Sequence, residues 1–167
     1  HLVQQVAQMI IKSLSDKGCI YICGNGGSAA DAQHIAAELV GRFRRERRAL
    51  PAIALSTDTS ALTSISNDYG FDDIFKRQLD AFIKPGDVFW GLSTSGTSAN
   101  VLSAARFAKQ KDAKIISFTG KPESELEKLS DLCIPFGNYP TARVQEINQL
   151  AYHMICDLVE EYFSKEE

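Results

Sequence analysis

The chain has 167 residues, of which 44% are hydrophobic and 23% are charged, and its formal net charge at pH 7 is −3. This profile is typical of one globular domain with a sizeable core, and so small a charge gives no overall field for nucleic acid. No apolar run approaches the roughly 20 residues of a membrane-spanning helix, and the sequence opens without a signal peptide pattern. We therefore expect a soluble protein with neither nucleic acid nor a membrane as partner.

An amphipathic helix begins the chain and ends at Lys17-Gly18. Its apolar positions are Val3, Val6, Ile10 and Leu14. We expect residues 1–167 to form a single domain. Because His1 directly abuts this helix, an N-terminal piece of the helix could be missing from the sequence.

A short apolar strand, residues 20–23, then runs into Gly24-Asn25-Gly26-Gly27-Ser28 and directly into a helix. Glycines permit positive φ and close approach of a ligand to the backbone. The first turn of the helix offers unpaired N–H groups and the positive end of its dipole. This arrangement predicts a site for an anion such as phosphate.

The same helix carries His34 and Glu38, spaced i,i+4 and therefore on one face. An imidazole and a carboxylate in this arrangement can chelate a metal or exchange protons with a substrate. The sequence leaves both roles open.

A second strand, loop and helix unit follows at residues 87–109. Its loop, Ser93-Thr94-Ser95-Gly96-Thr97-Ser98, carries five hydroxyl groups, which can surround a phosphate without adding charge. Ser98 is also placed to cap the following helix. One such loop could be an ordinary capped turn, but two in one short domain favour a phosphorylated ligand.

Short apolar strands are expected at about residues 19–24, 52–56, 87–92, 114–119 and 132–136, each separated from the next by a helical segment. This alternation predicts an α/β fold with a parallel sheet covered on both faces. The last helix, about residues 141–163, has an apolar stripe. The stripe contains Val144, Ile147, Ala151, Met154, Leu158 and Tyr162. We expect the first and last helices to pack against further copies of the chain.

Two other features concern charge and redox state. The segment Arg42–Arg48, with five arginines, is expected to be a solvated helix end, although Arg42 could reach a ligand or a neighbouring subunit. The four cysteines contain no CxxC pair and are interpreted as buried thiols of a reducing compartment, which points to the cytoplasm.

Two further candidates depend on their surroundings. Asn67-Asp68-Tyr69-Gly70-Phe71 could be only a turn, or Asp68 could contact the hydroxyls of a sugar. His153 follows Gln145 by eight residues, which is about 12 Å of helix rise and about 80° of rotation. If both bound one metal, their side chains would have to lean together, or a subunit contact would have to supply one of them.

These motifs, taken in order, resemble the sedoheptulose 7-phosphate isomerases, or phosphoheptose isomerases, of the sugar isomerase (SIS) fold. The resemblance is carried by Gly24–Ser28, His34 with Glu38, Asn67–Phe71, Ser93–Gly96 and Arg143-Val144-Gln145-Glu146. It implies a three-layer α/β/α sandwich with a five-stranded parallel sheet and a homotetramer with active sites between subunits. It also implies conversion of D-sedoheptulose 7-phosphate to D-glycero-D-manno-heptose 7-phosphate for lipopolysaccharide biosynthesis.

The resemblance also implies roles for individual residues. Glu38 and His153 match the catalytic pair, either of which could be the acid or the base. Substrate contacts are implied for Asn25, Gly26, Ser28, Asp68, Ser93, Thr94, Ser95, Ser98 and Gln145. A Zn²⁺ site is implied at His34, Glu38, Gln145 and His153. The chain departs from some members at Ala142, where they have Asp, and at Asn148, where they have His.

Proteins of this fold also act as adaptors for a replication initiator or as sugar-phosphate sensors joined to DNA-binding domains. An adaptor has no need of His34, Glu38 and His153 together, and a sensor needs a helix-turn-helix, which this sequence lacks. We therefore favour the isomerase.

Overall fold

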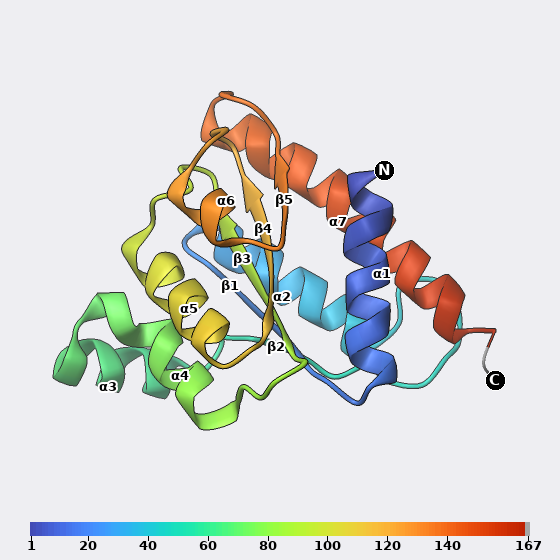
Figure 1. Cartoon of the computed structure of the whole chain (residues 1–167), viewed down its shortest axis with the longest axis horizontal. Coiled ribbons are helices and arrows are strands. Elements are labelled where there is room, and N and C mark those ends of the chain that lie inside the picture. Colours follow the sequence, from blue (N-terminus) through green and yellow to red (C-terminus); the bar gives the residue numbers. More distant parts are fainter. Residues whose placement is uncertain (166–167) are drawn as a thin grey trace.

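A computed structural model, which describes residues 1–165, has a five-stranded parallel sheet between two layers of helices (Figure 1). The strands are β1 (Ile20–Gly24), β2 (Ala52–Ala54), β3 (Val88–Ser93), β4 (Lys114–Thr119) and β5 (Leu132–Pro135). They lie in the order β2-β1-β3-β4-β5, and every neighbouring pair is parallel. The predicted α/β/α sandwich is therefore confirmed, with strand ends within two residues of those expected.

Each face of the sheet is covered by its own helices and has its own hydrophobic cluster. One face carries α1 (Leu2–Ser15), α2 (Gly27–Val40) and α7 (Thr141–Phe163). The other carries α3 (Thr59–Tyr69), the 3₁₀ turn η1 (Phe71–Asp73), α4 (Ile74–Phe82), α5 (Ala99–Gln110) and α6 (Glu125–Leu129). Alternate residues of one strand enter opposite clusters, which is why the strands are apolar throughout.

The strand order reverses between β1 and β3, which are neighbours in the sheet. Gly24 at the end of β1 pairs with Leu92 near the end of β3, so the loops that follow the two strands leave from the same edge. In open α/β sheets, ligands bind in the crevice at such a point. The fold thus places the two predicted phosphate loops side by side.

The predicted apolar stripe of α7 is partly wrong. Met154 and Tyr162 are 51% and 42% exposed, whereas the residues facing the core include Tyr152, Ile155 and Val159. Apolar residues occur on more than one face of α7, so the sequence pattern alone could not identify the face that meets the sheet. Of the helices within residues 1–165, none is both long enough and apolar enough to cross a bilayer.

The expectation for the basic segment is also wrong in part. Helix α2 ends at Val40, before the arginines begin, and Arg47 is only 5% exposed. Its guanidinium lies 3.5 Å from the carboxylate of Glu160, which is buried in α7. Arg42 is exposed and bonds to Glu46 at 3.0 Å.

Candidate functional site

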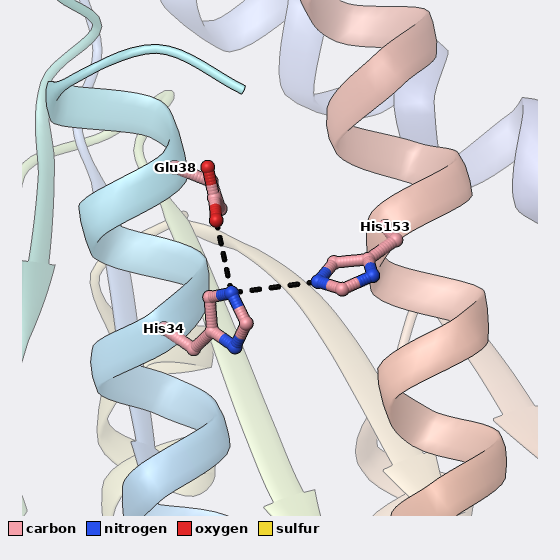
Figure 2. A group of neighbouring side chains, drawn as sticks. All are labelled: His34, Glu38 and His153. Carbon is pink, nitrogen blue, oxygen red and sulfur yellow. Dashed lines mark hydrogen bonds and ion pairs between the residues drawn. The ribbon is translucent and has the colours of Figure 1, made fainter. Parts of the chain in front are cut away.

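Helices α2 and α7 lie against each other, and His34, Glu38 and His153 meet between them (Figure 2). His34 Nε2 is 2.9 Å from Glu38 Oε1 and 3.4 Å from His153 Nε2. One nitrogen or oxygen atom from each residue lies within 4.8 Å of the other two. All three side chains are partly exposed, so an ion or a substrate can reach them. The cluster could hold a metal or transfer protons.

His153 lies among groups that favour its neutral form. Burial and the nearby His34 lower the pKa of His153, and the charge of Glu38 offsets only part of this effect. The ring of Phe43 packs against the His153 ring at a centroid distance of 5.3 Å. A neutral imidazole has a free nitrogen lone pair, which can accept a proton or bind a metal.

Tyr152, the residue before His153, contacts the other side of His34. Its hydroxyl is 2.9 Å from His34 Nδ1, while the residue as a whole is only 1% exposed. Burial, together with the charge of Asp31, raises the pKa of Tyr152 above its ordinary value. The Tyr152 hydroxyl therefore keeps its proton at neutral pH. Both ring nitrogens of His34 thus have partners.

The loop after β3 is organised around the Ser93 hydroxyl. Ser93 Oγ lies 2.9 Å from Ser98 Oγ and 3.3 Å from Ser95 Oγ, and it accepts a hydrogen bond from the Gly96 N–H at 3.1 Å. Ser98 stands at the N-cap position of α5, as its placement in the sequence predicts, but within the described residues its side chain makes no capping bond. Thr94 is partly exposed, and its carbonyl accepts from the Gly120 N–H at 3.0 Å.

The backbone of this loop depends on Gly96, which has φ +66°. A Cβ atom at this position would lie 2.3 Å from the side chain of Ser124. The loop therefore packs tightly against the start of α6 while Ser95 stays exposed.

The loop after β1 is joined to α5 by a pair of amide hydrogen bonds. Asn25 and Asn100 each donate to the other's side-chain oxygen at 2.9 Å. Gly26 has φ +56°, and apart from its own chain neighbours no atom of residues 1–165 lies within 4 Å of where its Cβ would be. Glycine is therefore required at this position because of the positive φ, and not because a side chain would lack room. Ser28 follows in the first turn of α2 and is 4% exposed.

Two predicted site residues lie apart from the cluster. The amide of Gln145 lies against Gly27, where a Cβ atom would be 2.3 Å from Nε2. Gly27 is seven residues, or about 10 Å of helix rise, before His34. Gln145 therefore does not lean toward His153 as one alternative required. Asp68 lies in the last turn of α3 rather than in a loop, is exposed, and accepts from Asn67 at 2.8 Å.

Three residues of this region escaped the sequence analysis: Phe43, Asn100 and Tyr152. A signal existed for Asn100, because it is a polar residue on the buried face of α5, immediately after the hydroxyl-rich loop. Phe43 and Tyr152 are apolar or aromatic residues of ordinary appearance, and only the packing of α2 against α7 places them at the histidines.

The geometry can be compared with known proteins. Residues 2–120 match the model of the SIS domain family. A phosphoheptose isomerase from Helicobacter hepaticus is 51% identical over 158 residues, covering 95% of this chain and 81% of that protein. The structure of phosphoheptose isomerase from Neisseria gonorrhoeae superposes with a TM-score of 0.90 at 43% identity, covering 96% of this chain and 85% of that one. The corresponding enzyme from Francisella tularensis gives a TM-score of 0.92 at 34% identity, with the same coverage.

The family model ends at residue 120, before β5 and α7, whereas the three relatives match 95–96% of the chain. The chain belongs to the SIS domain family and, within it, to the phosphoheptose isomerases.

Proposed function

We propose that this chain converts D-sedoheptulose 7-phosphate to D-glycero-D-manno-heptose 7-phosphate, a ketose-to-aldose isomerisation of heptose biosynthesis. The observation that carries the proposal is the meeting of His34, Glu38 and His153 in a chain 51% identical to a phosphoheptose isomerase. The substrate class follows from two adjacent loops suited to phosphate, which we assign to the phosphate end of the sugar.

Phosphate recognition would use neutral donors. Ser28, Ser93, Thr94, Ser95 and Ser98 supply hydroxyl groups, and the first turn of α2 supplies N–H groups and a helix dipole. Asn25 and Gly26 would line the sugar, and Gln145 lies close enough to Gly27 to join them. Binding the distant phosphate uses binding energy to orient the reacting carbons.

The reaction passes through an enediol. A base removes a proton from C1 and the carbonyl oxygen at C2 gains a proton, which gives the enediol; C2 is then protonated on carbon while the C1 hydroxyl loses its proton and becomes the aldehyde carbonyl. We assign these transfers to Glu38 and His153, one as base and the other as acid. The lowered pKa of His153 suits acceptance of a proton near neutral pH. Asp68 is too exposed within one chain to be placed at the sugar, so we propose that it contacts the sugar across a subunit boundary.

The cluster also fits a zinc ion, because two imidazoles and a carboxylate are ligands that suit zinc. His34, Glu38 and His153 would hold the ion, and we propose that Gln145 joins them through a subunit contact. Bound zinc would supply Lewis acidity to the substrate oxygens. A Glu38 carboxylate shared with a metal is a weaker base, so its two roles compete.

The assembly we propose is a homotetramer in the cytoplasm, with active sites at subunit interfaces and the chain acting as a single SIS domain. Support comes from an exposed groove of about 720 Å³ between α1 and α7, lined in part by Ile11, Leu158 and Tyr162. The four cysteines are free, although Cys19 and Cys133 are only partly buried. We propose neither nucleic acid nor a membrane as partner.

The test is incubation of the purified protein with sedoheptulose 7-phosphate, with the aldose detected directly. We expect turnover, close to one zinc per subunit, and loss of most activity to a strong chelator. No turnover with zinc supplied would overturn the isomerase and favour a non-catalytic adaptor. Full activity in demonstrably metal-free protein would remove zinc from the proposal and leave the acid and base pair.

A further inference from the structure

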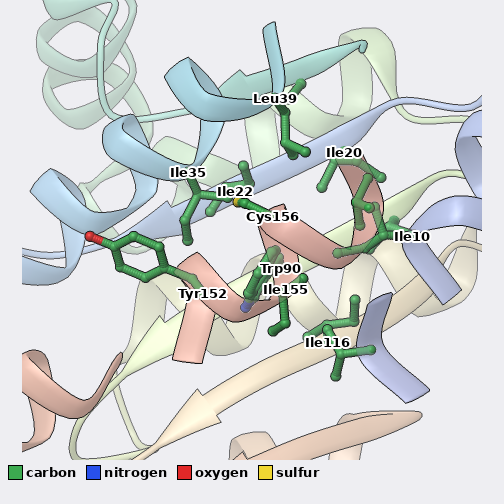
Figure 3. Packing of buried hydrophobic residues seen from close by; sticks show 14 of the residues in the cluster. Ile10, Ile20, Ile22, Ile35, Leu39, Trp90, Ile116, Tyr152, Ile155 and Cys156 are labelled. Carbon is green, nitrogen blue, oxygen red and sulfur yellow. The ribbon is translucent and has the colours of Figure 1, made fainter. Parts of the chain in front are cut away.

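Tyr152 is the residue of this region whose chemistry the isomerase reaction leaves unused. Its ring lies in the core beside Ile35, and its hydroxyl points out of the hydrophobic cluster toward α2 (Figure 3). Within residues 1–165, the one hydrogen bond of this hydroxyl is to His34 Nδ1, at 2.9 Å. A buried polar atom placed so specifically at a candidate metal ligand calls for a functional explanation.

The hydrogen bonds of His34 are coupled through its ring. An ionised carboxylate is an acceptor only, so the 2.9 Å contact with Glu38 requires a proton on His34 Nε2. In a neutral imidazole the other nitrogen is then an acceptor. With His34 neutral, the Tyr152 hydroxyl therefore donates to Nδ1 in the metal-free protein. Tyrosine, His34 and Glu38 form one directed chain of hydrogen bonds.

A metal at this cluster requires the opposite arrangement. His34 Nε2, which faces both Glu38 and His153, would need a free lone pair, so the ring proton would have to sit on Nδ1. A hydroxyl can accept as well as donate. By rotating, the Tyr152 O–H can accept from Nδ1–H, whereas a carbonyl or an ammonium group at this place could serve only one of the two forms.

The hydroxyl proton then needs an acceptor of its own. Asn148 lies one helical turn before Tyr152 on α7, on the same buried face. Its Oδ1 is buried and, among the residues described, has no hydrogen-bond partner. Asn148 Oδ1 is therefore an unused acceptor on the same buried face of α7 as Tyr152.

We propose that Tyr152 is a positioning residue whose hydroxyl orients the His34 ring in both of its neutral forms, donating to Nδ1 when His34 bonds Glu38 and accepting from Nδ1–H when His34 binds a metal. The part concerning the metal rests on the proposed function, whereas the part concerning the ring proton does not. Groups that bond the second nitrogen of a metal-binding histidine fix its orientation, and their loss typically weakens metal binding by about 10- to 100-fold.

The first test is nitrogen NMR of ¹⁵N-histidine-labelled, metal-free protein, in which only three histidines contribute signals. We expect His34 to have one protonated and one unprotonated ring nitrogen, and we expect the unprotonated Nδ1 signal to shift in Tyr152→Phe, because that nitrogen loses its hydrogen-bond donor. The matched control is Tyr21→Phe, because Tyr21 is also buried and donates to the Phe82 carbonyl at 3.3 Å on the opposite face of the sheet. Unchanged His34 signals in Tyr152→Phe would overturn the proposal.

The second test is the zinc dissociation constant, measured by competition with a coloured chelator. Tyr152→Phe should bind zinc about 10- to 100-fold more weakly than the unmodified protein, and Tyr21→Phe should bind it equally well. Equal affinity in Tyr152→Phe would overturn the metal part of the inference. If the unmodified protein binds no zinc, the proposed metal site is wrong, and the NMR result alone decides the role of Tyr152.

Discussion

Two polar clusters join α7 to α2 and to the loop after α2. They lie two helical turns apart on α7, one at Glu160 and the other at His153. They differ in how completely their polar atoms are hydrogen-bonded. At Glu160, one carboxylate oxygen accepts from the Phe43 N–H at 2.7 Å, and the other accepts from the Arg44 and Arg45 N–H groups at 2.6 and 2.7 Å. Arg47 completes the set by bonding the carbonyls of Glu38 and Gly41 at 2.7 and 2.8 Å. This cluster is buried and nearly closed, because Arg47 Nε is its one buried side-chain nitrogen or oxygen without a hydrogen-bond partner within residues 1–165.

The cluster of His34, Glu38 and His153 is open by comparison. Its side chains are partly exposed, and the two imidazoles face each other at 3.4 Å, a contact in which at most one nitrogen can be the donor. Buried polar groups with a structural role usually have hydrogen-bond partners, whereas groups that bind a ligand keep donors or acceptors free for it. From this difference we infer that Glu160 stabilises the fold and that Glu38 acts in the reaction, although both are glutamates at the contact between α2 and α7.

The sharpest test of this difference is Glu38→Gln, which removes charge but keeps size. We expect turnover of sedoheptulose 7-phosphate to fall by about 10²- to 10⁴-fold, as is typical when a general acid or base is lost. The free energy of unfolding should change by less than about 1 kcal/mol, because packing is unaltered. Steady-state kinetics and urea unfolding measure the two effects.

The control is Glu46→Gln, which makes the same change at an exposed residue beyond the end of α2 and should leave turnover unchanged. Exchange of the substrate's C1 proton with deuterium oxide identifies the base. If Glu38→Gln still exchanges this proton at the normal rate, Glu38 is not the base and His153 takes that role.

For Glu160→Gln we expect the reverse, a large loss of stability with little change in turnover. Removing one partner of a buried ion pair typically costs about 3 to 5 kcal/mol, because the remaining charge, here that of Arg47, stays buried without compensation. The amide would also place N–H groups against the backbone N–H donors of residues 43–45. Urea unfolding measures the loss, and activity assayed well below the melting temperature separates it from chemistry.

Glu161→Gln is the matched control for that variant, since Glu161 is the next residue of α7 and its carboxylate pairs with the exposed Lys165. Surface pairs of this kind contribute about 0 to 1 kcal/mol. If Glu160→Gln were as stable as Glu161→Gln, the closed cluster would not be the structural element described here.

The sequence could predict those parts of the site that depend on local order. The glycine and hydroxyl loops, the His34 and Glu38 pair, and the parallel sheet implied by alternation are all encoded within a few turns of chain. Tyr152 and His34 are 118 residues apart, and their contact depends on how closely α2 packs on α7. The same packing places Gln145 at Gly27 rather than at His153.

Glu160 is a different case, because its signal was present in the sequence. It lies on the face of α7 that carries Ile155, Cys156, Val159 and Phe163, where an isolated acid must have a buried partner. The basic segment Arg42–Arg48 was the obvious candidate to supply this partner. What the sequence could not reveal is that a single arginine of the five turns inward.

Phe43 is the point where the two clusters meet, because Glu160 holds its backbone and its ring packs on His153. Phe43→Leu should cost about 1 kcal/mol of stability, since aromatic pairs contribute about 0.5 to 1.5 kcal/mol beyond burial. Freed of this ring, His153 should be less well oriented, so we expect kcat to fall while KM stays nearly constant. A variant with normal kcat would show that the clusters act independently.

The smallest expected effect is a dependence of stability on pH that belongs to the open cluster. The folded protein lowers the pKa of His153, through burial and the nearby His34, below the value of about 6.5 for an unfolded chain. Below that value the unfolded state binds the proton more readily than the folded state does. The contribution of a neutral His153 is therefore complete above about pH 6.5 and is lost as the pH falls through the lowered folded pKa. Urea unfolding of metal-free protein between about pH 7.5 and pH 5 should show this loss.

In His153→Gln part of that slope should disappear, whereas His1→Gln, at the exposed first residue, should keep it. Equal slopes in the unmodified protein and His153→Gln would mean that another group titrates in this range. The pH dependence of stability would then no longer distinguish the cluster of Glu160 and Arg47 from the cluster of His34, Glu38 and His153. Only the different effects of Glu38→Gln and Glu160→Gln on turnover would then separate the two clusters.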